Sequence, residues 1–317
     1  STAPIIAGAF PSRDTMNTQA IQLPPSGEAA AILLPDPATV FLARAERFDA
    51  LALHHGLGEW LAFLGRLSRA QHAALQAAAQ DIAPPAEDVL ARARKHRMPP
   101  ISVASYQRPA VWREILRNIV GDLLENAPVG ARETLDGLLV TSAEDLDKLG
   151  EKLLNGEPEG ADMVRLPYVA AAMQVVFTAL ASKLDADALP LMEAHSTCPV
   201  CGSHPVVSVI RSDGPTAGLR YVHCTLCNTE WHVPHATCVS CGDRDKITLH
   251  EIDGDDGIAR AESCGSCESY TKLIVQPKNV RVDPIADDLA SVALDMLVDD
   301  AGFVRSGPNY LLIGAGE

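Results

Sequence analysis

All eight cysteines of this 317-residue chain lie between residues 198 and 267, where they form four Cys-x-x-Cys pairs. The pairs are Cys198/Cys201, Cys224/Cys227, Cys238/Cys241 and Cys264/Cys267. Two thiolates separated by two residues can both face one ion from a tight turn, and two such turns complete a tetrahedral shell of four sulfurs. This spacing therefore predicts two metal ions, each held by four cysteines.

The cysteine pattern is also an internal repeat. Adding 40 to the numbers of the first four cysteines gives the numbers of the second four, so the same spacing is written twice. Each repeat contains a complete set of four ligands. We therefore expect one ion to be bound within residues 198–227 and the other within residues 238–267.

Disulfide bonds are the alternative use for eight cysteines. They are typical of secreted domains, and a secreted chain needs an export signal. Residues 1–10 are mildly apolar but lack the basic segment that opens a signal peptide. We expect a cytoplasmic protein, where cysteine clusters are more often metal sites than disulfides.

The residues that follow each second cysteine fit metal-binding knuckles. Gly202 and Gly242 can turn with positive φ so that backbone N–H groups point at the thiolates. Asn228 tolerates the same conformation, whereas Glu268 does so poorly, and the sequence offers no reason for it. Short β-type runs at 206–210 and 219–222, and at 247–252 leading through a turn to Ile258, predict a hairpin between the two knuckles of each repeat. A final strand at 271–276 follows the last knuckle. Together these features predict two tandem zinc-ribbon or rubredoxin-like modules.

The sequence predicts an α+β protein in which an all-α helical bundle precedes these modules. Apolar residues recur at helical spacing over 40–52, 57–79, 86–95, 112–124, 141–154 and 168–184, giving six or seven helices. Asp283 before Pro284 marks the start of a last helix. The expected divisions are a loose, proline-rich arm (1–35), a helical domain (36–190), the four-cysteine modules (191–277) and a C-terminal helix and tail (278–317).

Charge and composition exclude several classes of function. The formal net charge is −15, and residues 198–276 carry six Lys or Arg against ten Asp or Glu, so there is no basic stripe for nucleic acid. No stretch reaches 18 apolar residues, which argues against stable membrane insertion. We find no Gly-rich phosphate loop, His-Glu-x-x-His or Gly-x-Ser-x-Gly motif. Four-cysteine shells leave no open metal position, so we do not expect an enzyme.

Several segments resemble a known family. The resemblance rests on CPVCGSHPVVSVI, LRYVHCTLCNTEWHVPHATCVSCGD, the fourth knuckle CGSC and the closing DPIADDLASVALDML. It extends into the helical half through GLGEWLAFLGRLSRAQHAAL and so covers the chain from about residue 35. The chain resembles the formate dehydrogenase accessory (formation) proteins of the FdhE type.

The resemblance implies a cytoplasmic assembly factor for respiratory formate dehydrogenase. Such a factor contacts the catalytic subunit of this twin-arginine-exported enzyme before export, and its rubredoxin-like sites are associated with iron. The ligands carried over are Cys198, Cys201, Cys224, Cys227, Cys238, Cys241, Cys264 and Cys267. The resemblance therefore favours iron. Zinc is the alternative, because only the first knuckle has the rubredoxin-like Cys-Pro-x-Cys-Gly form and the other three depart from it.

Three hypotheses follow from the sequence. The favoured one is a non-catalytic maturation factor whose partner-binding surface lies where the helical bundle meets the modules. The second is a zinc-ribbon module that binds another protein, and the third is a rubredoxin-like redox protein. A small ribbon has little core besides its metal, so loss of one cysteine is expected to unfold about 191–277 and to leave the helical half folded.

Overall fold

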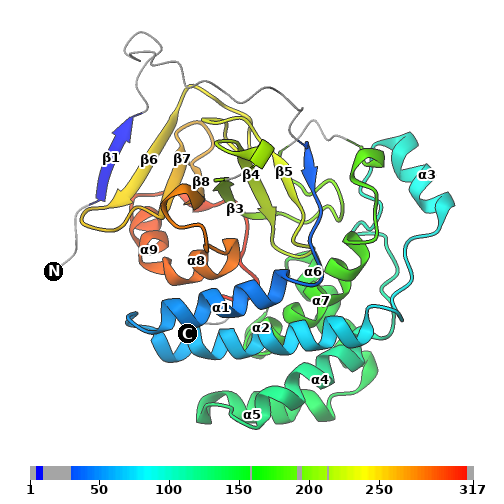
Figure 1. The fold of residues 1–317 in the computed structure, drawn as a ribbon. Helices are drawn as coiled ribbons and strands as arrows, with labels where there is room; N and C mark the ends of the chain where they lie inside the picture. Colours follow the sequence, from blue (N-terminus) through cyan, green and yellow to red (C-terminus); the bar gives the residue numbers. More distant parts are fainter. Residues whose placement is uncertain (1–4, 10–29, 158, 191–194, 213, 313–317) are drawn as a thin grey trace.

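The structure is a computed structural model that describes residues 5–9, 30–157, 159–190, 195–212 and 214–312. One mixed sheet stands over a layer of helices, and α8 (Pro284–Ala290) lies between the sheet and α1 (Val40–Ala52) (Figure 1). This arrangement confirms the predicted α+β class, with a helical half followed by a cysteine-rich β region. No helix among the described residues is both long enough and apolar enough to span a membrane.

Seven α-helices form the helical half in the described part of the chain. They are α1 (Val40–Ala52), α2 (Gly58–Ala78), α3 (Glu87–His96), α4 (Trp112–Leu124), α5 (Val129–Val140), α6 (Ala143–Asn155) and α7 (Leu166–Ala181). Six of them match predicted segments. Helix α7 is apolar on all sides and is buried from Tyr168 to Ala181, so it forms the centre around which α2, α4 and α6 pack.

Helix α5 is the one that the periodicity did not predict. It begins directly after Pro128, which the sequence suggests as a helix end. It contains Gly130 and Gly137, and only Leu135 and Leu138 are buried. Too few apolar residues therefore repeat at helical spacing for the sequence to predict this helix. Helix α6 is easier to predict, because Ser142 caps it by accepting a hydrogen bond from the Asp145 backbone N–H.

The two cysteine modules join into one sheet. The first contributes β3 (Pro205–Ile210), β4 (Arg220–Cys224) and β5 (Glu230–His232), and the second contributes β6 (Ile247–Ile252), β7 (Ala259–Cys264) and β8 (Ser269–Val275). The predicted hairpins β3/β4 and β6/β7 are present. Strand β8 pairs in parallel with β3, so these six strands follow the order β6-β7-β8-β3-β4-β5.

The predicted loose arm at 1–35 contains two strands in its described part. Strand β1 (Ile5–Ala9) pairs with β6, and β2 (Ile32–Leu33) pairs with β5, so each extends one edge of the sheet. The Tyr221 hydroxyl also donates a hydrogen bond to the Ala30 carbonyl at 2.7 Å. Local sequence does not reveal such strands, because their pairing partners lie about 240 residues away along the chain for β1 and about 200 for β2.

The last predicted helix is divided in two. Helix α8 (Pro284–Ala290) starts at Asp283, whose carboxylate accepts hydrogen bonds from the backbone N–H groups of Ile285 and Ala286. The helix ends at Ser291, whose hydroxyl donates back to the Asp287 carbonyl, and α9 (Val292–Asp300) follows. After β9 (Val304–Arg305), the tail packs Tyr310 and Leu311 into the main core. The predicted apolar run to residue 314 lies partly outside the described residues.

Candidate metal centres

The eight thiols gather into two groups of four, each with all its sulfurs within 4.8 Å of one another. The first group contains Cys198, Cys201, Cys224 and Cys227, and the second contains Cys238, Cys241, Cys264 and Cys267. Each group lies within one sequence repeat, as the 40-residue period predicts. No other His, Cys, Asp or Glu cluster in the described part of the chain is placed to hold an ion.

The sulfur spacing fits a tetrahedral ion. Neighbouring sulfurs are 3.4–3.5 Å apart in the first group and 3.6–3.7 Å apart in the second. A tetrahedron with metal–sulfur bonds of about 2.3 Å has edges of about 3.8 Å, which is close to these values. A disulfide needs about 2.05 Å, and all eight cysteines are free. Each group could therefore hold a thiophilic ion such as zinc or iron.

The knuckle turns have the predicted backbone conformation at all four positions. The φ angles are +75° at Gly202, +58° at Asn228, +78° at Gly242 and +56° at Glu268. The Glu268 N–H donates to the Cys264 carbonyl at 2.9 Å, and this bond closes the fourth knuckle. Gly202 and Gly242 make the same bond to Cys198 and Cys238, so the fourth knuckle keeps the turn although its residue is a glutamate.

The first site is enclosed by segments from outside its module. All four of its cysteines have an exposed fraction of 0%. The loop before α4 covers one knuckle, since the N–H groups of Ile101 and Val103 donate to the carbonyls of Val200 and Cys201. The other knuckle is held at Thr225, whose carbonyl accepts from Gln174 of α7 and whose hydroxyl donates to the Pro308 carbonyl.

A polar network supports the second knuckle of the first site. The Asn228 amide donates to the Thr178 hydroxyl at 2.8 Å, and its oxygen lies 3.1 Å from His223 Nε2. The other ring nitrogen of His223 lies 3.0 Å from Glu230. Burial alone would raise the pKa of Glu230, but the hydrogen bond to His223 and the charge of Arg211 outweigh it and lower the pKa.

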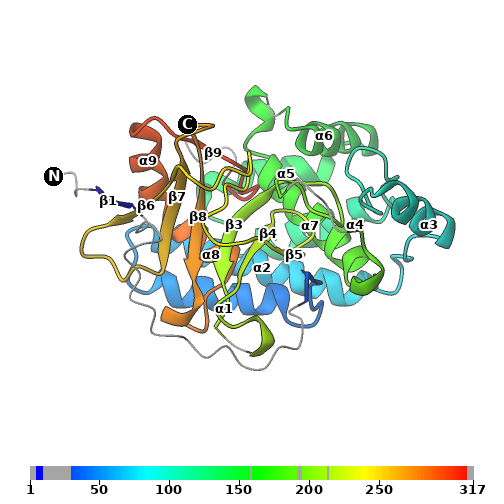
Figure 2. The same ribbon diagram turned by 90° about the horizontal axis from the view of Figure 1, so that it is seen from above.

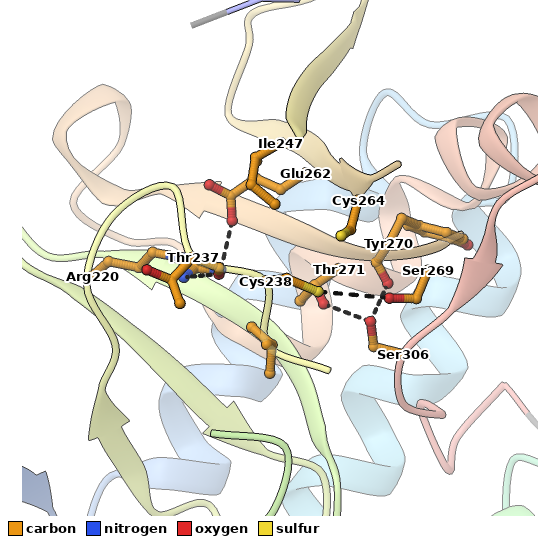
Figure 3. Close-up of a pocket in the computed structure, with 11 residues that line it drawn as sticks. Arg220, Thr237, Cys238, Ile247, Glu262, Cys264, Ser269, Tyr270, Thr271 and Ser306 are labelled. Atoms are coloured by element: carbon orange, nitrogen blue, oxygen red, sulfur yellow. Dashed lines mark hydrogen bonds and ion pairs between the residues drawn. The ribbon is translucent and has the colours of Figure 1, made fainter. Parts of the chain in front are cut away.

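The second site is only half enclosed. Cys238 and Cys264 are buried, whereas Cys241 and Cys267 are exposed. On the inner side lies a small cavity of about 10 Å³, roughly the room for one water molecule. Figure 3 shows Cys238 and Cys264 beside this cavity, together with the buried Arg220–Glu262 ion pair.

Thiolate ligands in the buried first group require a bound cation. Burial raises the pKa of the Cys198 and Cys201 thiols well above the usual value, so a nearby positive charge is needed to hold them as thiolates. At the second site, burial raises the pKa of Cys267, but hydrogen bonds from the Ser269 hydroxyl and backbone outweigh it, giving a pKa of about 7. The buried first group and the half-exposed second group both offer four sulfur ligands, which suit a soft divalent metal ion.

Family models described as FdhE N-terminal, central and C-terminal domains match residues 29–193, 197–235 and 236–312. The chain belongs to the FdhE family. The first four-cysteine group lies within the central FdhE domain, and the second lies within the C-terminal one. This membership confirms the resemblance that the cysteine segments and the helical half indicate.

Individual FdhE proteins are similar over almost the whole chain. A protein FdhE homolog from Edwardsiella ictaluri is 36% identical over 289 residues, covering 90% of this chain and 92% of the relative. One from Haemophilus influenzae strain PittEE is 33% identical, covering 93% and 96%. The crystal structure of the FdhE protein from Pseudomonas aeruginosa matches with a TM-score of 0.79 at 29% identity, covering 90% of this chain and all of that one.

Proposed function

We propose that this chain is a cytoplasmic accessory protein for the maturation of respiratory formate dehydrogenase. It binds the catalytic subunit of the enzyme before twin-arginine export and carries out no catalysis itself. The observation that carries the proposal is its FdhE membership across nearly the whole chain, with all eight cysteines of the chain gathered into two four-thiol groups.

The eight cysteines are proposed as the ligands of two metal ions, one in each group. Iron is favoured and zinc is the alternative. A metal held by four thiolates fixes the two knuckles of a module, and with iron it can also accept or donate one electron. The sites are supported by the sulfur spacing, the left-handed knuckles and the N–H groups of Val200, Leu226 and Cys227, which donate to sulfur.

The metal is identified by elemental analysis and an absorption spectrum of protein purified without air. Two equivalents of colourless zinc, together with no binding to a formate dehydrogenase subunit, would favour a zinc-ribbon module for another partner. A visible spectrum that bleaches reversibly, together with turnover with a reductant, would favour a rubredoxin-like redox protein. Iron at two equivalents without such turnover supports the maturation factor.

The function is tested by deleting the gene from its host. We expect the dehydrogenase subunits to be made but inactive, while other molybdenum enzymes keep their activity. The chain should also capture the unexported catalytic subunit in a pull-down without added cofactor. Full formate dehydrogenase activity in the deletion strain would contradict the proposal. The surface where the helical half meets the modules stays our prediction for the site of this contact.

A further inference from the structure

The two four-cysteine groups have the same spacing but different surroundings. The first belongs to the main hydrophobic core, which also contains Trp112 and Phe177 of the helical half. The second lies in the module that contributes β6–β8, at the side of the molecule away from α3–α6 (Figure 2). Residues of this module pack with α9 in a separate small cluster. The second site is therefore covered on the inner side, by its own module together with Arg220 and Ser306, and open to solvent on the outer side.

The exposed side of the second site consists of two complete knuckle tips. Cys241 lies between exposed Ser240 and Gly242, and the whole stretch 265–268 around Cys267 is exposed. Two hydrogen bonds join the tips across this face. The Ser266 hydroxyl donates to Asp243 Oδ2 at 2.8 Å, and the Ser269 hydroxyl donates to the Ser240 hydroxyl at 3.1 Å. The other oxygen of Asp243 accepts two backbone N–H groups, so the carboxylate is held in place.

We propose that the second group is an exchange site for a thiophilic metal ion, while the first group releases its ion at least about tenfold more slowly. An incoming thiol from solution or from a protein partner acts at Cys241 and Cys267, whose sulfurs can be approached from outside. This inference rests on the proposed role of the eight cysteines as metal ligands. The Asp243–Ser266 hydrogen bond slows the exchange, because it holds the two tips together.

The exchange step needs no oxidant or reductant. The incoming thiol loses its proton and forms a bond to the metal, and the bond from the metal to Cys267 or Cys241 breaks. The released cysteine thiolate takes up a proton, so charge and electrons balance and the oxidation state of the metal does not change. The same attack is blocked at the first site, where no sulfur is exposed and the neighbouring backbone is covered by the loop at 101–103.

The experiment uses the full chain loaded with zinc, which has no redox chemistry of its own. Zinc release is followed with a coloured chelator in the presence of glutathione, and samples are alkylated with iodoacetamide at set times and mapped by mass spectrometry. We expect one equivalent of zinc to leave at least about tenfold faster than the other. Cys241 and Cys267 should be alkylated first, before Cys198, Cys201, Cys224 and Cys227.

Two variants test the hydrogen bond between Asp243 and Ser266. Asp243→Ala and Ser266→Ala should speed the fast phase by about tenfold, a usual effect of removing a group that supports metal ligands, and leave the slow phase unchanged. Asp245→Ala removes an exposed carboxylate two residues away and is the matched control, expected to release zinc like the parent. Circular dichroism checks that each variant is folded.

Release of both ions at one rate, or alkylation of Cys201 and Cys224 as early as Cys267, would overturn the exchange proposal. Equal rates for Asp243→Ala and Asp245→Ala would overturn the role of the hydrogen bond. A folded chain that binds no zinc or iron would overturn the metal assignment as well. None of these results depends on formate dehydrogenase activity, so a failure of the exchange proposal is distinguishable from a failure of the maturation function.

Discussion

Nη2 of Arg44 in α1 lies 2.7 Å from Oδ1 of Asn228, the left-handed residue that follows Cys227. The Nε of the same guanidinium donates to Asp283 at 3.1 Å, at the start of α8. Arg44 has an exposed fraction of 0%. One buried cation therefore joins the helical half, the first four-cysteine site and the C-terminal helix, which are far apart in the sequence.

We predict that Arg44→Met lowers the free energy of unfolding by about 3–5 kcal/mol, because it leaves Asp283 buried without its ion pair. Asn228 also loses a donor, so zinc should leave the first site faster. Urea unfolding and metal analysis measure these effects. Arg69→Met is the matched control, since Arg69 and Asp49 are nearly half exposed and their pair contributes at most about 1 kcal/mol. Equal stability of the two variants would refute the prediction.

A second buried pair joins the two modules. Arg220 of β4 lies 2.6 Å from Glu262 of β7, and both side chains are almost fully buried. Arg220→Met should cost about 3–5 kcal/mol of unfolding free energy, since it leaves the glutamate buried and unpaired. The double variant Arg220→Met/Glu262→Leu should be more stable than the single variant, because no buried charge remains. A double-mutant cycle in urea measures this, and a double variant as unstable as the sum of the singles would contradict it.

The sequence predicts features that depend on local spacing. The grouping of the cysteines, the positive φ at the knuckles, the β3/β4 and β6/β7 hairpins and six of the seven helices of the described helical half all follow from residues close together in the chain. Glycine at a turn or an apolar residue at every third or fourth position is enough to indicate them.

Contacts between distant segments are what the sequence does not reveal. Cys201 and Cys241 have the same spacing to their partners, yet one is buried and the other exposed, because the loop at 101–103 covers only the first. Arg44 on an amphipathic helix suggests a solvated face, but Asp283 supplies a partner from 239 residues away. The parallel pairing of β3 with β8 is equally remote in sequence.

The free energy of unfolding should depend on pH, because the imidazole of His250 is buried. Nε2 of His250 lies 2.6 Å from the Ser263 hydroxyl, and burial lowers the pKa of this imidazole. Above about pH 6.5, the ring is neutral in both the folded and unfolded chain. As the pH falls, the unfolded chain takes up the proton first, so the free energy of unfolding decreases until the folded pKa is passed.

His250→Gln should therefore make stability less dependent on pH between 7 and 5. Urea midpoints of zinc-loaded protein, with metal content measured at each pH, test this. Some dependence should remain, because burial also lowers the pKa of His195 and His232. His96→Gln, at an exposed position on α3, is the control and should keep the slope of the parent. The prediction is wrong if both variants show the same slope.

The two four-cysteine sites should differ in how much of the chain unfolds when one cysteine ligand is removed. Sequence reasoning expects any ligand loss to unfold only about 191–277. The shared core changes this expectation for the first site, because Cys201 packs in the same cluster as Trp112 and Phe177. Cys201→Ser should lower the melting temperature of the whole chain and expose the helical half to protease. Cys241→Ser at the exposed position should lose one metal ion and open only the second module. Limited proteolysis with mass spectrometry tests this pair, and cleavage confined to 191–277 in Cys201→Ser would show that the helical half is stable without the first site.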